Sequence, residues 1–320
     1  MCGIVGYIGK KNAAPILIEG LRRESYRGYD SSGIVVLDNG ESICLKAVGK
    51  LDSLEKKLQD NQLKGEVGLG QVRWATHGAV TESNAHPHFD CRKNIFLVHN
   101  GIVENYKELK EELIKEGHKF NSETDTEVIA HLIEKFFQGN LEEAVIKTLK
   151  LIKGAYGLAI VAQNDPGKIV AARNSSPILI GIGEDEHIVA SDAAAIVSRT
   201  KKVIYLDDGE IAILTPSRFF ITDINQNQIE KTVKEIDWDL KEAQKGGYPH
   251  FMLKEIMEQP ESVANSLRGR LIIESGLAKL GGLELVQARL RKIERLNIIA
   301  CGTSYYAGLA GEYMLEEYAG

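Results

Sequence analysis

Short runs of β-branched and aliphatic residues, flanked by glycine, asparagine and aspartate, dominate the first two thirds of the chain. Such runs between turn-forming residues are typical of β-strands. We therefore predict two successive groups of strands before Pro216: Gly3–Ile8, Gly33–Leu37, Ile43–Val48, Val67–Val72 and Ile95–Val98, then Leu158–Ala162, Ile169–Ala172, Ile178–Ile182, Ile188–Ala190, Val203–Leu206 and Glu210–Leu214. Asp208-Gly209, between the last two strands, predicts a hairpin turn that joins them.

Helical spacing interrupts this β-rich region in three places. Apolar residues repeat at helical intervals through Tyr106–Ile114, Val128–Phe136 and Leu141–Ile152. Thr124–Glu127 reads Thr-Asp-Thr-Glu, a capping-box pattern that predicts the start of the second helix. Many strands with a few amphipathic helices indicate an α+β layered domain, in which helices cover the outer faces of the sheets.

The apolar periodicity stops between residues 236 and 250, which predicts a linker after a first domain of residues 2–235. Beyond it we expect helices at Phe251–Leu267 and Leu283–Leu290, then a buried strand at Leu296–Ala300. Cys301–Ser304 and a final helix follow this strand. The order strand, loop, helix is typical of the opening of an α/β unit, so we expect residues 251–320 to be the first part of a second domain.

Composition narrows the class of protein. The chain has 320 residues, 43% hydrophobic and 26% charged, which suits a two-domain globular protein with a real core. The net charge of −6 argues against a nucleic acid or an anionic membrane as partner. No apolar run approaches the roughly 18 residues of a membrane span, and no signal peptide is recognisable. The four cysteines lie far apart without a CxxC pair, which favours a reducing cytoplasm over a disulfide framework.

Cys2 is the first candidate for chemistry. Methionine before a small residue is usually excised, which would leave a thiol and a free α-amine on one residue. The amine titrates near about 7.7–8.0 and the thiol near about 8.5, so the amine can accept the thiol proton near neutral pH. The alternative is a small, half-buried strand residue that happens to come second.

Three downstream segments offer groups that suit acyl transfer, although each also has a structural explanation. Arg73–Gly78 (RWATHG) contains a guanidinium for a carboxylate, or it is a surface turn. Asn100 and Gly101 can supply two N–H donors to an oxyanion, or they form an ordinary Asn-Gly turn. Asp125 can bind an ammonium, or it complements a helix dipole.

Two further segments contain reactive side chains. The glycines of Arg27–Gly33 would let the backbone approach a ligand, with Arg27 and Asp30 as orienting groups; the alternative is a polar loop. His86, His88 and Cys91 have the side chains of metal ligands, but they have no fourth ligand and no recognised spacing. We therefore expect no metal and no other cofactor.

The order of these motifs carries more information than any one of them. Cys2–Gly6 (CGIVG), Tyr26–Ser31 (YRGYDS), Arg73–Gly78, His99–Gly101 and Glu123–Glu127 (ETDTE) together resemble the glutamine–fructose-6-phosphate aminotransferase family, and the likeness continues through Lys254–Pro260 and Cys301–Tyr305. The phosphoribosyl-diphosphate amidotransferases and asparagine synthetases share the N-terminal nucleophile, but they are not expected to continue into a sugar-isomerase domain.

The resemblance implies a four-layer αββα N-terminal-nucleophile hydrolase fold, followed by the beginning of an α/β sugar-isomerase (SIS) domain. It also implies a role for each matching residue: Cys2 as nucleophile with its own amine as base, Asn100 and Gly101 as oxyanion hole, Arg73 and Asp125 with Thr76 and His77 as the glutamine site, Arg27 as orienting group, Trp74 as gate of an ammonia passage, and Thr303 and Ser304 as sugar-phosphate ligands.

The implied activity is hydrolysis of L-glutamine to glutamate and ammonia through a cysteine thioester. In the full-length family the ammonia passes to fructose 6-phosphate, giving glucosamine 6-phosphate for hexosamine biosynthesis. Family members are about twice this length, so we expect this chain to act as a glutaminase alone. For the full-length protein we expect a homo-oligomer. Two alternatives stay open: His77 as the base of a Cys–His pair, and a non-catalytic module that binds glutamine or a sugar phosphate.

Overall fold

The computed structural model describes residues 2–38, 40–59, 61, 63–236, 247–268, 270–272, 276–278, 286–290 and 292–319. They form two compact units, residues 1–244 and 245–320. Most of the predicted linker lies outside the described residues, but Ile236 is buried in the core of the first unit. Among the described residues, no helix combines the length and the apolar character that a bilayer crossing requires.

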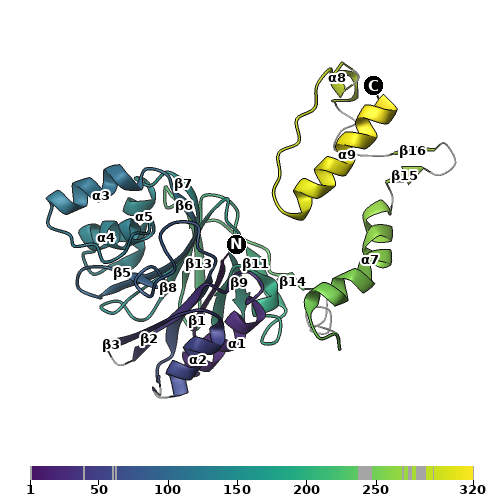
Figure 1. Ribbon diagram of the computed structural model, residues 1–320. Coiled ribbons are helices and arrows are strands. Elements are labelled where there is room, and N and C mark those ends of the chain that lie inside the picture. Colours follow the sequence, from purple (N-terminus) through teal and green to yellow (C-terminus); the bar gives the residue numbers. More distant parts are fainter. Residues whose placement is uncertain are drawn as a thin grey trace. The chain divides into compact units, whose positions relative to one another are not determined.

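Two antiparallel sheets form the centre of the first unit (Figure 1). The eight-stranded sheet has the order β14-β11-β9-β10-β1-β4-β2-β3, and its strands are β1 (Gly3–Ile8), β2 (Ser31–Asp38), β3 (Glu41–Val48), β4 (Val67–Arg73), β9 (Leu179–Ile182), β10 (His187–Ala190), β11 (Lys202–Tyr205) and β14 (Lys234–Glu235). The six-stranded sheet has the order β13-β12-β8-β7-β6-β5, and its strands are β5 (His88–Phe89), β6 (Ile95–Val103), β7 (Gly154–Ala162), β8 (Ile169–Asn174), β12 (Glu210–Leu214) and β13 (Phe219–Asp223).

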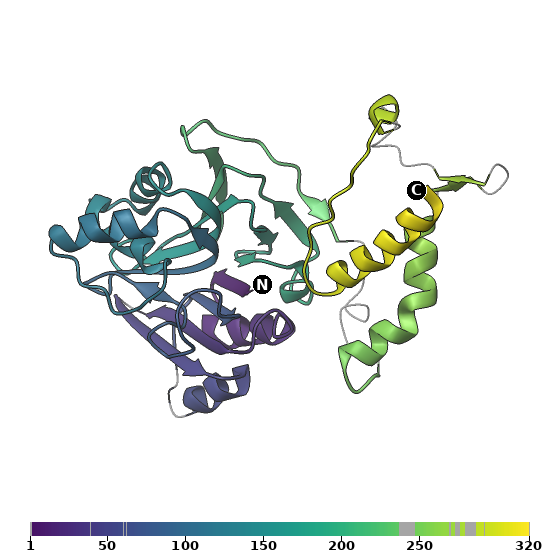
Figure 2. The ribbon, with the colours of Figure 1, turned by 45° about the horizontal axis from the view of Figure 1, so that its top comes forward.

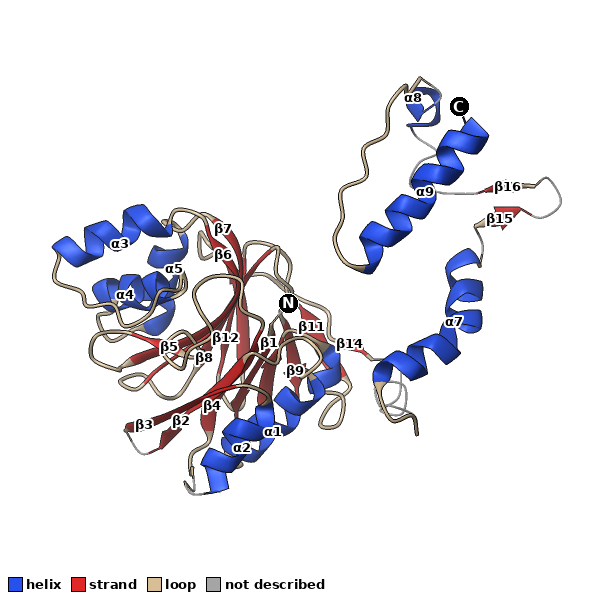
Figure 3. Cartoon of the chain, in the orientation of Figure 1, coloured by secondary structure: helices blue, strands red, loops and turns tan. Residues whose placement is uncertain are grey.

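Helices cover the outer face of each sheet (Figure 3). The first sheet carries α1 (Ala13–Arg23) and α2 (Leu51–Gln59), and a short 3-10 turn, η1 (Ala193–Ala195), packs on α1. The second sheet carries α3 (Tyr106–Lys115), α4 (Glu127–Phe136) and α5 (Leu141–Leu149). Figure 2 shows the two helix groups on opposite outer sides of the sheets. The unit therefore has the helix, sheet, sheet, helix order that we expected.

Each interface between layers has its own apolar core, because side chains alternate along every strand. In β1, Val5 and Tyr7 pack toward α1, while Ile4 and Ile8 pack between the two sheets. The third core joins the second sheet to α3–α5. All three cores lie within residues 4–236, so the first unit contains a complete set of packed layers.

The structure corrects the predicted hairpin at Asp208-Gly209. β11 pairs with β9 and β14 in the first sheet, whereas β12 pairs with β8 and β13 in the second. The turn reverses the chain, but it carries the chain from one sheet to the other. Both strands contribute to the core between the sheets, through Ile204 and Ala212, so face-to-face packing replaces hydrogen-bonded pairing.

The capping box is also corrected. Glu127 accepts backbone N–H bonds from Asn121 and Ser122, both at 2.7 Å, instead of bonding back to Thr124. Thr124 contacts His88 and Ser122 through its hydroxyl. The sequence pattern was present, but the chain before α4 curls over the helix end and provides other donors.

Two helices of the first unit, α1 and α2, were not predicted. α1 begins after Asn12, whose side chain accepts from the N–H of Ala14. This hydrogen bond satisfies a backbone donor that the first turn of a helix would otherwise leave unpaired. Asparagine before an apolar run is thus the local signal that marks the start of α1.

The second unit contains α7 (Phe251–Leu267), β15 (Leu271–Ile272), β16 (Leu277–Ala278), α8 (Gln287–Leu290) and α9 (Thr303–Ala319). The predicted helix at 251–267 and the final helix are present, and residues 283–285 of the predicted helix at 283–290 lie outside the described residues. The predicted strand at Leu296–Ala300 is not a strand, and Ile299 is 95% exposed. A strand needs neighbours that pair its backbone groups, and in the described part of the chain no strand pairs with this segment.

Candidate active site

A cavity of about 500 Å³ opens where the ends of β1, β4 and β6 meet. Its volume is in the range of small-molecule sites, about 300–1,000 Å³. The structure brings together there the eight residues predicted for glutamine hydrolysis and Trp74, the predicted gate, from five separate stretches of the chain: Cys2, Arg27, Arg73, Trp74, Thr76, His77, Asn100, Gly101 and Asp125.

Hydrogen bonds hold both the carbonyl group and the thiol of Cys2. Its carbonyl oxygen accepts hydrogen bonds from Arg27 Nε at 3.1 Å and Asn100 Nδ2 at 3.0 Å. Its Sγ accepts the backbone N–H of Trp74 at 3.2 Å. Burial raises the pKa of the Cys2 thiol, while the Trp74 N–H and the positive charges of Arg73 and Arg27 act in the opposite direction. The thiol therefore needs a base before it attacks.

Arg27 is fixed by an acidic neighbour. Its NH1 lies 3.1 Å from Asp192 Oδ2, and the side chain of Arg27 is only 8% exposed. Behind this pair Glu24 is fully buried and accepts from Ser191 Oγ and the Asp192 N–H, at 2.8 and 3.0 Å. Burial raises the pKa of Glu24 to about 8, so near neutral pH it is largely a neutral acid.

The orientation of Asn100 is set by Gln71. Gln71 Nε2 donates to Asn100 Oδ1 at 3.0 Å and to the His99 carbonyl at 2.7 Å. Since Oδ1 is used in this way, the amide nitrogen of Asn100 faces Cys2. Gln71 is a positioning residue that sequence reasoning missed, although it is the one polar side chain in the run Val67–Val72.

Gly101 has no room for a side chain. Its φ is +140°, and a Cβ would collide with the Ala155 carbonyl oxygen on the neighbouring strand β7. A comparable contact exists at Gly28, where a Cβ would lie 2.6 Å from the carbonyl carbon of Arg73. The backbone around the cavity is therefore packed against itself, and glycine is required at both positions.

Arg73 organises the loop that contains Thr76 and His77. Its guanidinium donates to the carbonyl oxygens of His77, Gly78 and Ala79. The imidazole of His77 lies against Tyr106, with Nε2 at 3.1 Å from the hydroxyl. Burial lowers the pKa of the Arg73 guanidinium, and the Cys2 thiol and two carboxylates oppose this change.

Asp125 lines the same cavity and precedes α4. Its Oδ2 accepts the Val103 N–H at 2.7 Å, and its side chain is buried. The capping-box pattern predicts that Asp125 lies in the first turn of the helix, but the N-cap is Thr126 and the helix begins at Glu127. The carboxylate is thus tied to the end of β6, in the stretch of chain before the helix starts.

His99, which carried no predicted role, connects β6, β7 and the start of α4. Its Nδ1 lies 2.9 Å from Thr126 Oγ1, and its Nε2 lies 3.3 Å from the Ala155 carbonyl. A carbonyl only accepts, so Nε2 holds the proton and Nδ1 accepts from the threonine hydroxyl. Burial lowers the pKa of His99, which keeps the ring neutral.

The remaining predicted residues are placed as follows. Trp74 is 43% exposed, and its ring contacts Tyr29 edge-on at a centroid distance of 5.3 Å. Thr303 and Ser304 begin α9 in the second unit, and both are exposed. The structure separates Cys91 from the two histidines that precede it: the rings of His86 and His88 pack on one another in the interior, whereas Cys91 Sγ lies 3.5 Å from His131 Nδ1.

Comparison with known proteins shows which families the chain is similar to. A family model described as a glutamine amidotransferase domain matches residues 72–198. Two enzymes named glutamine–fructose-6-phosphate aminotransferase (isomerizing) are each 48% identical to the whole chain; the chain covers 53% of the one from Chlorobaculum tepidum and 52% of the one from Aquifex aeolicus. The chain thus spans about half the length of the curated relatives that it matches.

Solved structures agree with the fold. The glutamine phosphoribosylpyrophosphate amidotransferase of B. subtilis superposes with a TM-score of 0.61 at 28% identity, over 71% of this chain and 50% of that one. A structure described as the allosteric regulatory enzyme of purine biosynthesis gives a TM-score of 0.62 at 30% identity, with the same coverage. Residues 72–198 therefore match a glutamine amidotransferase domain, and along its whole length the chain is similar to one half of the glutamine–fructose-6-phosphate aminotransferases.

Proposed function

We propose that this chain hydrolyses L-glutamine to glutamate and ammonia, with Cys2 as the nucleophile after removal of Met1. The α-amine of Cys2 takes the thiol proton, and the sulfur attacks the side-chain amide carbon. The tetrahedral intermediate collapses to a thioester as the ammonium returns its proton to the departing ammonia. Water, activated by the same amine, then cleaves the thioester to glutamate.

The observation that carries this proposal is the position of the Cys2 carbonyl and sulfur between Asn100, Arg27 and the Trp74 backbone. These hydrogen bonds hold the Cys2 thiol at the edge of the cavity and restrict the rotamers that its side chain can adopt. Near-attack geometry of this kind removes much of the entropic barrier to reaction. The second N–H of the Asn100 amide and the Gly101 N–H are the proposed oxyanion donors, because they lie on the strand beside Cys2.

The α-carboxylate and the α-ammonium group of glutamine suit opposite charges on the cavity wall. Arg73 has five N–H donors and uses part of them on three loop carbonyls, so it can still pair with an α-carboxylate. Asp125 uses one oxygen on the Val103 N–H, which leaves its second oxygen for the α-ammonium. Thr76 and His77 line the same cavity and complete the proposed substrate site.

For the full-length protein we propose transfer of the ammonia to fructose 6-phosphate in hexosamine biosynthesis, in the cytoplasm and as a homo-oligomer. The relatives' name supports the sugar acceptor. In this proposal Trp74 gates the ammonia passage, residues 251–320 begin the sugar-isomerase domain, and Thr303 and Ser304 bind the sugar phosphate at the start of α9. A helix N-terminus with hydroxyls suits a phosphate.

Glutamate release by the purified chain tests the core of the proposal. We expect Cys2→Ala to lower the rate at least about 1,000-fold, since the covalent route is lost. Cys301→Ser, an exposed cysteine in the second unit, is the matched control and should keep the full rate. Hydrolysis that survives Cys2→Ala would exclude Cys2 as the nucleophile, and glutamine binding without turnover by the unaltered chain would favour a binding module.

The choice of base is tested separately. The hydrogen bonds of Cys2 Sγ go to the Trp74 backbone, while His77 bonds to Tyr106; this favours the α-amine over a Cys–His pair. Retaining one extra residue before Cys2 removes the free amine and should abolish activity. His77→Ala should raise KM more than it lowers kcat, because we assign His77 to substrate binding. The reverse pattern in both variants would assign the base to His77.

A further inference from the structure

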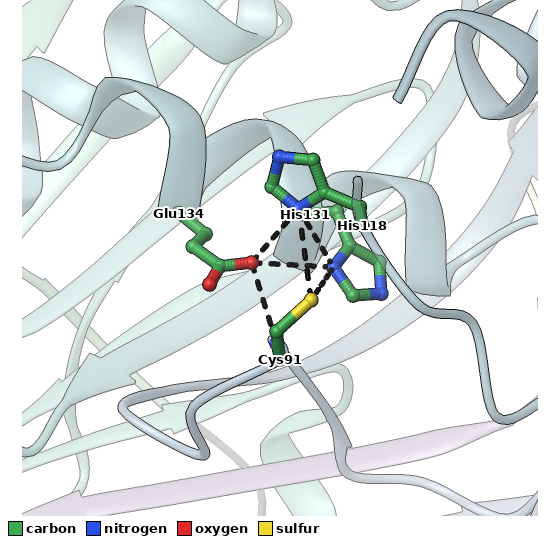
Figure 4. Close-up of side chains that lie close together, drawn as sticks. All are labelled: Cys91, His118, His131 and Glu134. Carbon is green, nitrogen blue, oxygen red and sulfur yellow. Dashed lines mark hydrogen bonds and ion pairs between the residues drawn. The ribbon is translucent and has the colours of Figure 1, made fainter. Parts of the chain in front are cut away.

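A second group of chemically active side chains lies in the first unit, separate from the residues assigned above (Figure 4). Cys91 comes from the loop between β5 and β6, and His118 from the loop between α3 and α4. His131 and Glu134 are three residues apart on α4, so they share one face of the helix. Figure 4 shows all four side chains pointing toward one another.

The four donor atoms converge on one point. Cys91 Sγ, His118 Nδ1, His131 Nδ1 and a Glu134 carboxylate oxygen all lie within 4.8 Å of one another. Between individual pairs, the two Nδ1 atoms are 3.3 Å apart, Sγ is 3.5 Å from His131 and 3.8 Å from His118, and Oε2 is 2.9 Å from His118 and 3.4 Å from His131.

These five separations are close to the edges of a tetrahedral coordination shell. With Zn–N and Zn–O near 2.0–2.1 Å and Zn–S near 2.3 Å, a tetrahedron has nitrogen–nitrogen and nitrogen–oxygen edges of about 3.3 Å and nitrogen–sulfur edges of about 3.5 Å. Each of these pairs matches its edge within about 0.4 Å, including the short His118–Glu134 pair. The sixth pair, Cys91 Sγ and the Glu134 oxygen, lies within 4.8 Å. The sulfur–oxygen edge of the same tetrahedron is about 3.6 Å, so a central cation bonded to all four atoms requires these two side chains to approach by up to about 1.2 Å, while the other pairs move little.

Groups next to the cluster orient His131 and Cys91 so that a lone pair of each ligand atom faces the cluster. His131 is fully buried, and its Nε2 lies 3.6 Å from the carboxylate of Glu127, one turn back on α4. A proton on Nε2 is attracted to this carboxylate, which leaves the Nδ1 lone pair facing the cluster. A carboxylate behind a metal-binding histidine is the usual outer-shell arrangement. The Lys119 N–H donates to Cys91 Sγ at 3.3 Å, which similarly orients the sulfur.

We propose that Cys91, His118, His131 and Glu134 bind one Zn²⁺ ion. One thiolate, two imidazoles and one carboxylate suit a borderline-soft cation with tetrahedral preference, whereas Mg²⁺ and Ca²⁺ prefer oxygen ligands. Four protein ligands fill the shell, so the site is structural and not catalytic. It ties the loop before β6 and the loop before α4 to α4 itself, and these elements carry Asn100 and Asp125.

Metal content of the full chain, purified without chelator, is the direct test. We expect about one zinc per chain, and chelator-treated protein should take up zinc chloride with a Kd below about 1 μM. Cobalt(II) in place of zinc should give a thiolate-to-metal charge-transfer band in the near ultraviolet. Neither measurement depends on glutaminase activity, so failure of this proposal and failure of the proposed function are distinguishable.

Three variants sharpen the test. Cys91→Ser and His118→Ala change residues on loops, so both should fold, and each should weaken zinc binding at least about 100-fold. Cys91→Ser should also lose the cobalt charge-transfer band. Cys301→Ser, which alters an exposed cysteine in the other unit, should retain both properties. Zinc binding below about 0.2 per chain at about 10 μM zinc, or equal affinity in Cys91→Ser and the unaltered chain, would reduce the group to a hydrogen-bond cluster and overturn the proposal.

Discussion

At the scale of single residues, one additional atom or proton at two positions in or near the cavity changes the stability of the folded protein. Gly101 has room for a hydrogen but not for a methyl group, because the Ala155 carbonyl of β7 lies against its Cα. For Glu24 the protonation state depends on the surroundings in a comparable way, because its carboxyl group is buried among hydrogen-bond donors, with Arg27 and Asp192 nearby. Both positions lead to tests that do not require an activity assay.

Gly101→Ala should lower the free energy of unfolding by about 2–4 kcal/mol, measured by urea titration, because the new Cβ meets backbone that cannot move aside. The matched control is Gly117→Ala. Gly117 also has a positive φ, of +98°, but a Cβ there would have no neighbour within 4 Å, so only about 1 kcal/mol of backbone strain is expected. Equal losses in the two variants would refute the steric explanation.

The pH dependence of stability should report on Glu24. Its folded-state pKa of about 8 lies above the ordinary value of 4.5, so between these pH values the folded protein holds a proton that the unfolded chain releases. This contribution to stability is complete below pH 4.5 and is lost as pH rises toward 8, with a slope of at most about 1.4 kcal/mol per pH unit.

Glu24→Gln keeps a neutral acceptor and donor at this position and should flatten that slope. Urea titrations at several values between about pH 5 and 8 measure it. Glu19→Gln, on the partly exposed face of α1, serves as control and should leave the downward slope in place. Partial burial raises the pKa of Glu19, but hydrogen bonds from Arg23 and Ser198 and the charge of Arg23 outweigh it and lower the pKa. A parallel slope in the Glu24 variant would contradict the assignment.

At the scale of elements, helix ends position the walls of the site. α4 begins shortly after Asp125, and α5 packs on α4 across the outer core. α5 begins after Asn140, whose side chain accepts the N–H of Glu143 at 3.0 Å. This cap satisfies one of the backbone donors that the first turn of a helix leaves unpaired.

Asn140→Ala should therefore cost about 1 kcal/mol in the free energy of unfolding. Lys147→Ala lies on the exposed side of the same helix and should change this energy by less than about 0.5 kcal/mol. Chemical denaturation monitored by circular dichroism compares the two variants. A loss of stability in the lysine variant as large as in the asparagine variant would show that the Asn140 cap does not stabilise the helix specifically.

At the scale of the whole molecule, the three apolar cores explain where the first unit ends. All three lie within residues 4–236, and among the described residues Ile236 is the last that belongs to one of them. It follows β14, which pairs with β11 at the edge of the first sheet. The cavity is lined entirely by residues 2–177.

A chain that ends at Gln244 should accordingly unfold in one cooperative transition and hydrolyse glutamine at the rate of the full chain. A chain that ends at Ile229 loses β14 and Ile236, exposes β11, and should unfold several degrees lower. Differential scanning calorimetry and glutamate release check both. If the two shortened chains are equally stable, the edge strand is not part of the folding unit.

Much of this protein follows from local patterns in the sequence. Alternating and continuous apolar runs located β1 and β12 to the residue and most other strands within a few positions, because side-chain periodicity along a strand is a local property. The order of motifs from Cys2 to Glu127 was sufficient to name the candidate residues of the cavity, all nine of which the structure brings together.

Other features depended on partners that lie far away in the sequence. A turn at Asp208-Gly209 reverses the chain, but only packing between the sheets decides that β11 and β12 belong to different sheets. Gln71 is a positioning residue only because it contacts Asn100, and Cys91 has chemically active neighbours only because it lies against α4. No sequence-spacing rule predicts contacts between residues so far apart in the chain. The sequence by itself determined most of the strands and three of the helices of the first unit, and it showed which residues carry reactive groups. The tertiary structure decided which of those groups meet, because contacts between distant residues depend on the packing of whole layers.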